Sequence, residues 1–395
     1  MKSALDNIRV LDLTRVLAGP YATMLLADLG ADVIKIEMPK SGDDSRHFGP
    51  YLNNESAYFM AINRNKKSMT LNLKNESGKE IFLELVKKTD VLVENFRPGT
   101  MEKLGLGYDN LIALNPKLIY AAASGYGHTG PYSQRAAYDA VVQAMGGIMS
   151  ITGEKDGRPI RVGTSIGDIS AGLFTTIGIL SALISRNVTG KGQMVDVAML
   201  DCQVAILENA IARYFVTGVV PRPYGNRHTS IVPFEVFETS DGEIMVAAGN
   251  NSLWGKLCNV LDCCELINDE RFRDNSDRNK NYDELRPLLA LRFSTKTTIE
   301  WQELLDNEGI PNGPINTIDK VVTNIQVLAR DMIVDVYHPV AKNFKMPGIP
   351  IKLSETPGSI RTSSPTLGQH TKEILKEYLG ADDNTIGKLI DEGTI

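Results

Sequence analysis

The sequence predicts an α/β fold built on a parallel sheet, and three observations support this expectation. A strand pattern at residues 8–13 is followed by a helix pattern at 21–29 and a second strand pattern at 33–37. This order is typical of parallel strands, whose connections are long enough to hold a helix. The same alternation continues downstream, and the 395 residues exceed what one ordinary core holds. We therefore expect a large parallel-sheet domain and a second, smaller domain.

Start and stop signals place the first helices. The helix at 21–29 ends at Gly30, because glycine commonly terminates helices. A capping box of Ser77 and Glu80 predicts a second helix over 79–87. Both helices would cover a face of the sheet.

Two further buried strands are expected at 91–96 and 118–122, and each runs into a polar or glycine-rich loop, at 95–99 and 124–130. In open α/β sheets, ligands bind at the carboxyl ends of parallel strands. These loops are therefore expected to line a binding site.

A change of composition after Asp201 predicts the smaller domain. Strand patterns at 234–239 and 243–248 flank an Asp-Gly turn, which is typical of a β-hairpin, and charged helices follow, one of them capped by Thr297 and Glu300. The chain then returns to strand-like pieces and a helix at 371–379, so the large domain is expected to be discontinuous. We expect residues 1–200 to form the first part of the large domain, 201–223 a linker, 224–324 a small α+β domain, and 325–395 a linker and the return to the large domain.

Charge and cysteine content limit the possible partners. The 42 Lys and Arg against 48 Asp and Glu give a net charge of −6, which argues against nucleic acid as a partner. The four cysteines have no spacing suited to zinc, so we expect no metal and a reduced, cytoplasmic protein. No signal-peptide pattern is seen, and the uncharged segment 173–185 is too short to span a bilayer, so no membrane partner is expected.

Local basic clusters are still suited to one phosphorylated ligand. The first cluster is formed by Arg64, Lys66 and Lys67. Lys74, Arg97 and Lys103 also fall in or next to loops that follow the early strands. Such placement at the ligand-binding edge suits a ligand with several phosphates, although charges of this kind usually form a solvated face.

The segment 163–172 places one carboxylate, Asp168, between small residues just before an uncharged segment that reads as a buried helix. Small neighbours allow a bulky ligand to approach the backbone. An ordinary aspartate has a pKa of about 3.9, so at neutral pH it could attack an activated acyl group without a base. In the alternative interpretation, Asp168 only caps its own helix.

A serine hydrolase is a second alternative. Residues 163–167 match the GxSxG pattern of a nucleophile elbow, with Ser165 as the nucleophile and a strand pattern at 159–162 before it. His338 or His370 would complete a triad. The glycines could also serve only to pack a sharp turn.

Several segments together resemble one known family. They are residues 10–14, 18–20, 29–37, 63–68, 93–99, 124–127, 167–168, 189–193 and 196–199. Their order and spacing resemble the class III CoA-transferases, which include formyl-CoA:oxalate and carnitine CoA-transferases, across essentially the whole chain. The resemblance implies a Rossmann-like large domain, a small domain, two long linkers and an interlocked homodimer of ring-shaped chains, an exception to the rule that chains do not thread.

The resemblance also implies a reaction. Asp168 falls on the family's nucleophile, which takes an acyl group from acyl-CoA and passes CoA to a small carboxylic acid through mixed-anhydride and aspartyl-CoA thioester intermediates. Coenzyme A is then a substrate, and no prosthetic group is implied. The residues expected to contact CoA are Val16, Leu17, Ala18, Leu71, Asn72, Leu73, Lys74, Asn95, Phe96, Arg97, Lys103, Ala136, Ala137, Tyr138 and Asp139. Tyr58 and His228 are expected to contact the substrate.

This sequence departs from the formyl-CoA transferase pattern at three places. Met38 stands where an arginine contacts the nucleotide, so another basic group must serve here. Leu17 stands where a glutamine approaches the acyl group, and residues 225–233 replace a glycine-rich lid. These departures put oxalate in doubt as the acceptor.

The related α-methylacyl-CoA racemases provide another alternative. They exchange the proton next to the thioester with a histidine and an aspartate, and their histidine occupies the position of Tyr138, just before Asp139. A phenol with a pKa near 10 is a poor base at neutral pH. His128 lies ten residues too early in the sequence to replace that histidine.

Overall fold

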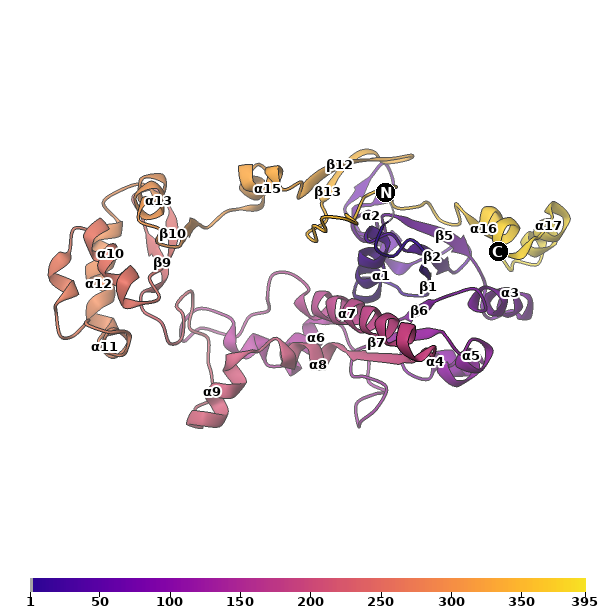
Figure 1. Cartoon of the computed structure of the whole chain (residues 1–395), viewed down its shortest axis with the longest axis horizontal. Helices are drawn as coiled ribbons and strands as arrows, with labels where there is room; N and C mark the ends of the chain where they lie inside the picture. Colours follow the sequence, from indigo (N-terminus) through magenta and orange to yellow (C-terminus); the bar gives the residue numbers. More distant parts are fainter. Residues whose placement is uncertain (1–2) are drawn as a thin grey trace. The chain divides into compact units, whose positions relative to one another are not determined.

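A six-stranded parallel sheet lies at the centre of the larger unit of the computed structural model, which describes residues 3–395 (Figure 1). Its strand order is β5-β2-β1-β6-β7-β8, and every neighbouring pair is parallel. The six strands are β1 (Arg9–Asp12), β2 (Asp32–Glu37), β5 (Lys66–Thr70), β6 (Val91–Glu94), β7 (Ile119–Ser124) and β8 (Met194–Ala198). This sheet confirms the predicted α/β fold.

Helices and short hairpins complete the larger unit. The hairpins are β3 (Tyr51–Leu52) with β4 (Glu55–Ser56), and β12 (Ile333–His338) with β13 (Lys342–Pro347). The α-helices are α1 (Ala18–Asp28), α2 (Ala57–Ile62), α3 (Glu76–Val86), α4 (Thr100–Lys103), α5 (Tyr108–Leu114), α6 (Asp139–Met145), α7 (Ile166–Thr189), α8 (Met199–Ala205), α9 (Asn209–Thr217), α15 (Ile325–Ala329), α16 (Thr371–Leu379) and α17 (Asp383–Asp391). The 3-10 turns are η1 (Asp44–His47) and η2 (Ile148–Ile151), and the last two residues of η2 already belong to the smaller unit.

Alternate residues of the strands build two hydrophobic layers. Val10, Val33 and Val91 pack against α1 and α7 on one face of the sheet. Leu11 and Leu92 pack against α3, α5, α16 and α17 on the other face. Because side chains alternate between the faces of a strand, helices cover both faces, as is typical of doubly wound parallel sheets.

The carboxyl ends of the strands share one edge of the sheet. The parallel register brings Asp12, Glu37, Thr70, Glu94 and Ser124 to the ends of neighbouring strands. The loops that follow these residues carry most of the predicted CoA contacts. This edge is therefore where the candidate site must be sought.

Residues 150–160 and 220–324 form the smaller unit. Its antiparallel sheet has the order β11-β10-β9, and the hairpin predicted around the Asp-Gly turn is confirmed. Phe237 stacks on Phe293 with ring centroids 4.5 Å apart in the core. Its elements are β9 (Phe234–Glu238), β10 (Glu243–Ala247), α10 (Asn251–Val260), η3 (Cys264–Ile267), α11 (Asn275–Lys280), α12 (Tyr282–Phe293), α13 (Thr298–Asn307), β11 (Asn312–Pro314) and α14 (Ile318–Val321).

Three local expectations are wrong. Helix α3 is capped by Asn75, whose side chain accepts the Gly78 N–H at 3.0 Å, and not by a Ser77–Glu80 capping box. Residues 159–162 form no strand. The uncharged segment belongs to a helix of 24 residues, α7, which by length and composition alone could cross a membrane. Half of that apolar stretch is buried against the rest of the protein. The helix α7 therefore also matches the description of a core helix, and its residues pack in one of the hydrophobic layers.

Candidate functional site

Asp168 lies in the first turn of α7, two residues inside the helix. The residue at the N-cap position is Ser165, and its side chain makes no capping hydrogen bond. The carboxylate that satisfies the start of α7 comes from Asp139, whose Oδ1 accepts the Gly167 N–H at 2.8 Å. The interpretation of Asp168 as an N-cap is therefore wrong, and its side chain is left for another role.

Asp139 positions this helix start together with Gln143. The Gln143 amide donates to Asp139 Oδ2 at 2.7 Å, and its Oε1 accepts the Val162 N–H at 2.9 Å. Asp139 is 8% exposed and does not line the cavity that contains Asp168. The structure therefore places Asp139 behind the helix start as a support, not among the residues facing a ligand as we expected.

The small residues around Asp168 allow helices to approach each other. A Cβ at Gly172 would lie 2.8 Å from the Ala18 carbonyl oxygen, and one at Gly167 would lie 2.9 Å from Asp139 Oδ1. Such distances are too short for any side chain. Glycine at these positions lets α1 and α6 pack closely on α7, and the Ala18 backbone forms a hydrogen bond with Asp168.

The electrostatic surroundings of Asp168 disfavour its charged form. Burial raises its pKa, the negative charge of Asp139 raises it further, and the hydrogen bond from the Ala18 backbone lowers it only in part. The resulting pKa is about 7, well above the ordinary aspartate value on which the sequence argument relied. The carboxyl group is therefore close to half ionised at neutral pH, a property common among catalytic acids and nucleophiles.

Asp168 faces a cavity of about 310 Å³ at the carboxyl edge of the sheet, which we call the Asp168 cavity. Most of the residues expected to contact CoA lie around it. It is lined by Arg15, Val16, Leu17, Ala18, Asp44, Asn95, Phe96, Arg97, Pro98, Ala123, Ser124, Gly125, Arg135, Ala136, Ala137, Tyr138, Asp168 and Met199.

A second cavity of about 480 Å³, the Met38 cavity, shares part of that lining. It brings together Leu71, Leu73, Lys74 and Lys103, which the sequence had assigned to CoA. Its lining is Leu13, Thr14, Arg15, Ile36, Glu37, Met38, Ser41, Gly42, Asp43, Asp44, Leu71, Leu73, Lys74, Phe96, Thr100, Lys103 and Leu104. Asn72 lines neither cavity and instead faces a neighbouring hollow beside Met38 and Thr70.

Tyr58 lies on α2 and packs with Leu17 and Ile169. Burial, followed by the negative charge of Asp168, raises the pKa of its phenol to about 12. Tyr58 therefore stays neutral and lies within electrostatic range of Asp168. This position is compatible with the substrate contact that we expected for Tyr58.

His228 belongs to the smaller unit, where its ring shapes a local turn. The ring stacks on Phe234 with centroids 5.2 Å apart, and its Nδ1 accepts the N–H groups of Ser230 at 3.2 Å and Ile231 at 3.1 Å. These contacts give His228 a structural role in its own loop. Its expected contact with substrate stays a prediction.

The basic cluster at residues 64–67 does not face the ligand edge, so that expectation is wrong. Arg64 is buried and paired with Asp28 at 2.7 Å. Lys66 is also buried, with its Nζ 2.9 Å from Asp12. Lys67 is the second residue of β5 and lies near the amino end of that strand, whereas the cavities lie at the carboxyl ends of the strands. In this segment, Arg64 and Lys66 therefore form buried ion pairs inside the protein.

The serine-hydrolase interpretation does not fit the histidines. The Nδ1 atom of His338 accepts the N–H groups of Val340 and Ala341, at 3.2 and 3.0 Å. The Nδ1 of His370 accepts the Ser68 N–H at 3.1 Å. Both rings are used to fix backbone, and Ser165 lacks the preceding strand that a nucleophile elbow requires.

The racemase interpretation lacks its histidine, because no histidine is among the residues that line the Asp168 cavity. Tyr138 is 77% exposed, and His128 does not line the Asp168 cavity. The His128 N–H donates to Asp196 at 3.0 Å, and its Nε2 lies 3.7 Å from Glu94 Oε1. Burial raises the pKa of that glutamate to about 7, and neither side chain of this pair lines the Asp168 cavity.

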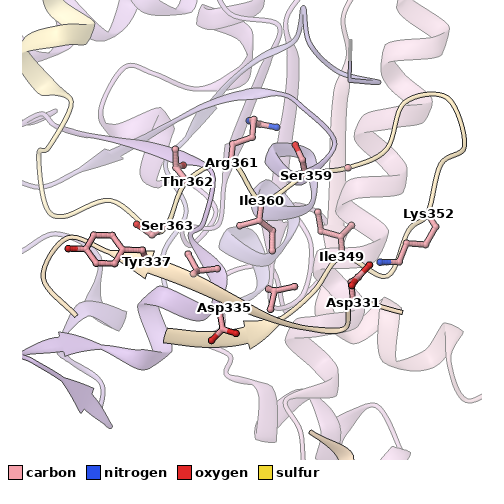
Figure 2. A pocket seen from close by; sticks show the side chains of 13 residues that line it. Asp331, Asp335, Tyr337, Ile349, Lys352, Ser359, Ile360, Arg361, Thr362 and Ser363 are labelled. Carbon is pink, nitrogen blue, oxygen red and sulfur yellow. The ribbon is translucent and has the colours of Figure 1, made fainter. Parts of the chain in front are cut away.

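A cavity of about 510 Å³ between the β12–β13 hairpin and residues 358–363 contains none of the predicted site residues (Figure 2). Figure 2 shows Lys352 and Asp331 pointing toward each other at its rim. Among residues 3–395, no group of three His, Cys, Asp or Glu side chains is arranged to hold a metal ion.

Arg15 and Arg135 line the Asp168 cavity but were not among the predicted site residues. Arg15 lies in the loop that follows β1, so the rule that loops after parallel strands bind ligands could have identified it. Arg135 lies in a longer loop after β7, and no local pattern distinguishes it from a solvated charge. The arginines at this edge give the cavity a positive character suited to anionic ligands.

Comparisons with known proteins agree with one another. The family model described as CoA-transferase family III matches residues 5–371. The chain is 44% identical to succinyl-CoA:glutarate CoA-transferase of Mus musculus, over 99% of this chain and 90% of the mouse protein. It is 43% identical to acetyl-CoA:oxalate CoA-transferase of Acetobacter aceti, over 95% of this chain and 96% of that protein. The crystal structure of a CAIB/BAIF family protein from Brucella suis is 41% identical, with a TM-score of 0.85 over 96% of this chain and 100% of that one.

Proposed function

The chain belongs to CoA-transferase family III, and we propose that it moves coenzyme A from a short acyl-CoA to a free carboxylate through intermediates on Asp168. The observation that carries the role of Asp168 is its placement. Its carboxyl group lies in the first turn of α7 and does not cap that helix. It faces a cavity of about 310 Å³ that is also lined by arginines. Its raised pKa also makes the anion a stronger nucleophile than an ordinary aspartate.

The proposed reaction has four steps, and in each step one bond to a carbonyl carbon forms and another breaks. The Asp168 carboxylate attacks the thioester carbonyl, the C–S bond breaks, and a mixed anhydride and CoA thiolate result. The thiolate attacks the aspartyl carbonyl and releases the donor acid, which leaves an aspartyl-CoA thioester. The acceptor carboxylate attacks this thioester, the C–S bond breaks, and a second anhydride and CoA thiolate result. The thiolate then attacks the acceptor carbonyl of that anhydride, which forms the new acyl-CoA. Asp168 is regenerated as a carboxylate.

We infer the substrates mainly from the names of the similar proteins and less from the shape of the Asp168 cavity. We propose a short acyl-CoA such as succinyl-CoA as donor and a small dicarboxylate or hydroxy acid as acceptor, because the similar proteins are named for succinyl-CoA with glutarate and acetyl-CoA with oxalate. The test is a mass-spectrometric screen of acetyl-, succinyl- and formyl-CoA against a panel of carboxylates. A new acyl-CoA that requires the free acid supports transfer. Deuterium exchange next to the thioester, without any need for an acceptor, would instead indicate a racemase.

The pKa of Asp168 predicts how transfer depends on pH. Because the anion is the nucleophile and its pKa in the free protein is about 7, kcat/KM should fall about tenfold per pH unit below that value and level off above it. Replacing Asp139 with asparagine removes a neighbouring negative charge, which makes the Asp168 anion easier to form. The midpoint of the Asp139→Asn profile should therefore move to lower pH. A profile that is flat between about pH 5 and pH 8 would contradict this assignment.

We also propose that the working form is an interlocked homodimer. The exposed side of α7 carries Ile177, Ile184 and Val188, which are 57%, 69% and 86% exposed, and Phe215 and Val216 of α9 are 79% and 85% exposed. Apolar patches of this kind mark interaction surfaces. Sedimentation should show a dimer at every concentration, with an unfolding temperature that rises with protein concentration. A folded, active monomer on dilution would rule out interlocked chains.

A further inference from the structure

The Met38 cavity and the Asp168 cavity meet at three residues. Arg15, Asp44 and Phe96 line both of them. The Met38 cavity otherwise holds Lys74 and Lys103, and the Asp168 cavity otherwise holds Arg97 and Arg135. Among the described residues, Arg15 is therefore the one basic side chain that lines both cavities.

A ligand that occupies both cavities must pass this junction. Coenzyme A consists of an adenosine phosphate at one end, the pantetheine thiol at the other, and a diphosphate between them. This step rests on the proposed function, in which the thioester reaches Asp168 in one cavity. The adenosine then occupies the other cavity, and the diphosphate lies where the two cavities join.

The backbone of Arg15 is fixed at this junction. Its N–H donates to Asn95 Oδ1 at 2.8 Å, and its carbonyl accepts from the Asn95 amide at 2.8 Å. The next residue, Val16, has a φ of 69° and donates its N–H to Asp43 Oδ1 at 3.1 Å. Since a β-branched residue rarely adopts a positive φ, the loop is held in this form by these contacts. The direction in which the Arg15 side chain leaves the backbone is thus set in advance.

The guanidinium of Arg15, in contrast, is held only weakly. Its Nη1 lies 3.2 Å from Asp44 Oδ2, and the two side chains are 49% and 54% exposed. Its central carbon lies 5.2 Å from the centroid of the Phe96 ring. An exposed ion pair of this kind contributes little to stability, whereas a diphosphate offers two charged groups to a planar guanidinium.

We propose that Arg15 binds the diphosphate of coenzyme A and exchanges Asp44 for it when the ligand enters. Arg15 would then supply the positive charge that Met38 does not provide in this chain. Lys74 and Lys103 remain for the adenosine phosphate end, because they line only the Met38 cavity.

The test compares Arg15→Met with Lys87→Met in the full-length protein. Lys87 forms an ion pair with Glu84, and those side chains are 45% and 52% exposed, so the control removes a pair of similar exposure away from both cavities. By calorimetry, Arg15→Met should weaken the binding of CoA about ten- to a hundredfold, the effect of losing a charged hydrogen bond. Lys87→Met should bind CoA as the wild type does. Asp44→Asn should bind CoA at least as tightly as the wild type, because the competing carboxylate is gone.

Two shortened ligands locate the contact. With dephospho-CoA, which keeps the diphosphate and lacks the 3′-phosphate, the loss in Arg15→Met should persist. With pantetheine, which lacks both, Arg15→Met and wild type should bind alike. A loss that disappears with dephospho-CoA, or CoA binding unchanged in Arg15→Met, would overturn the proposal while the wild type still binds CoA. A wild-type protein that binds no CoA would instead overturn the proposed function itself.

Discussion

Replacing Asp168 with asparagine should lower CoA transfer at least about a thousandfold, because the amide cannot form the anhydride on which each later step depends. The substitution is nearly isosteric, so the protein should still fold. The rate is measured as the appearance of a new acyl-CoA from an acyl-CoA and a free acid. Asp139→Asn is the matched control, since it replaces the neighbouring carboxylate that supports the start of α7. Its rate above about pH 7 should fall far less, because the nucleophile remains.

The same variant should also change stability in a way that depends on pH. The folded protein raises the pKa of Asp168 to about 7, above its value in an unfolded chain, so folding opposes the anion. The loss of folding stability caused by Asp168 is absent below the pKa that Asp168 has in the unfolded chain. It grows as the pH rises to about 7 and stays constant above that value. Asp168→Asn should therefore raise the unfolding temperature at pH 8 more than at pH 4. Near-normal turnover, once deamidation of the asparagine has been excluded, would remove Asp168 from the mechanism.

Replacing Lys66 with methionine should destabilise the protein by about 3–5 kcal/mol, because it leaves the Asp12 carboxylate buried beside one fewer positive charge. The Lys66 ammonium lies 2.9 Å from Asp12 Oδ2 and 2.7 Å from Thr23 Oγ1. Burial lowers the pKa of Lys66 to about 8, although the Asp12 charge opposes the change. The loss is measured as the change in the free energy of unfolding in urea.

The neighbouring residue provides the control for this prediction. Lys67 lies one position along β5, is 29% exposed, and pairs with Asp32 at 3.6 Å, so Lys67→Met should cost less than about 1 kcal/mol. If Lys66→Met does not fold, adding Asp12→Asn should recover part of the stability by removing the unpaired charge. A loss in Lys66→Met no larger than in Lys67→Met, together with weaker CoA binding, would restore Lys66 as a ligand residue.

Local patterns were sufficient for the parts of the fold whose stability is local. The helix at α16 and the hairpin of β9 and β10 were placed correctly, because periodicity, turn chemistry and caps are properties of neighbouring residues. The Thr297–Glu300 capping box is present for the same reason. Loops that follow β6 and β7 were expected at a binding edge, and both contribute residues to the Asp168 cavity.

The errors concern contacts between residues far apart in the chain. The two lysines at the start of β5 were expected to suit a phosphorylated ligand, because the local sequence does not show that Asp12, 54 positions before Lys66, balances the buried charge of Lys66. From the sequence, Asp168 was treated as an ordinary aspartate. Its raised pKa depends on burial and on the charge of Asp139 from another helix, and neither is visible in the local sequence. Glycines 167 and 172 looked like space for a ligand, whereas they make room for α6 and α1. No spacing along the sequence contains this information.

The most direct test of the account is to trap the covalent intermediate on Asp168. The protein is incubated with an acyl-CoA that it uses as donor, treated with hydroxylamine, digested, and analysed by peptide mass spectrometry. Hydroxylamine converts an activated aspartyl carbonyl into a hydroxamate, so we predict a hydroxamate on Asp168 that appears only when acyl-CoA is present. An acyl group on Ser165 in a sample digested without hydroxylamine, or an unmodified Asp168 in a protein that is turning over, would contradict the account.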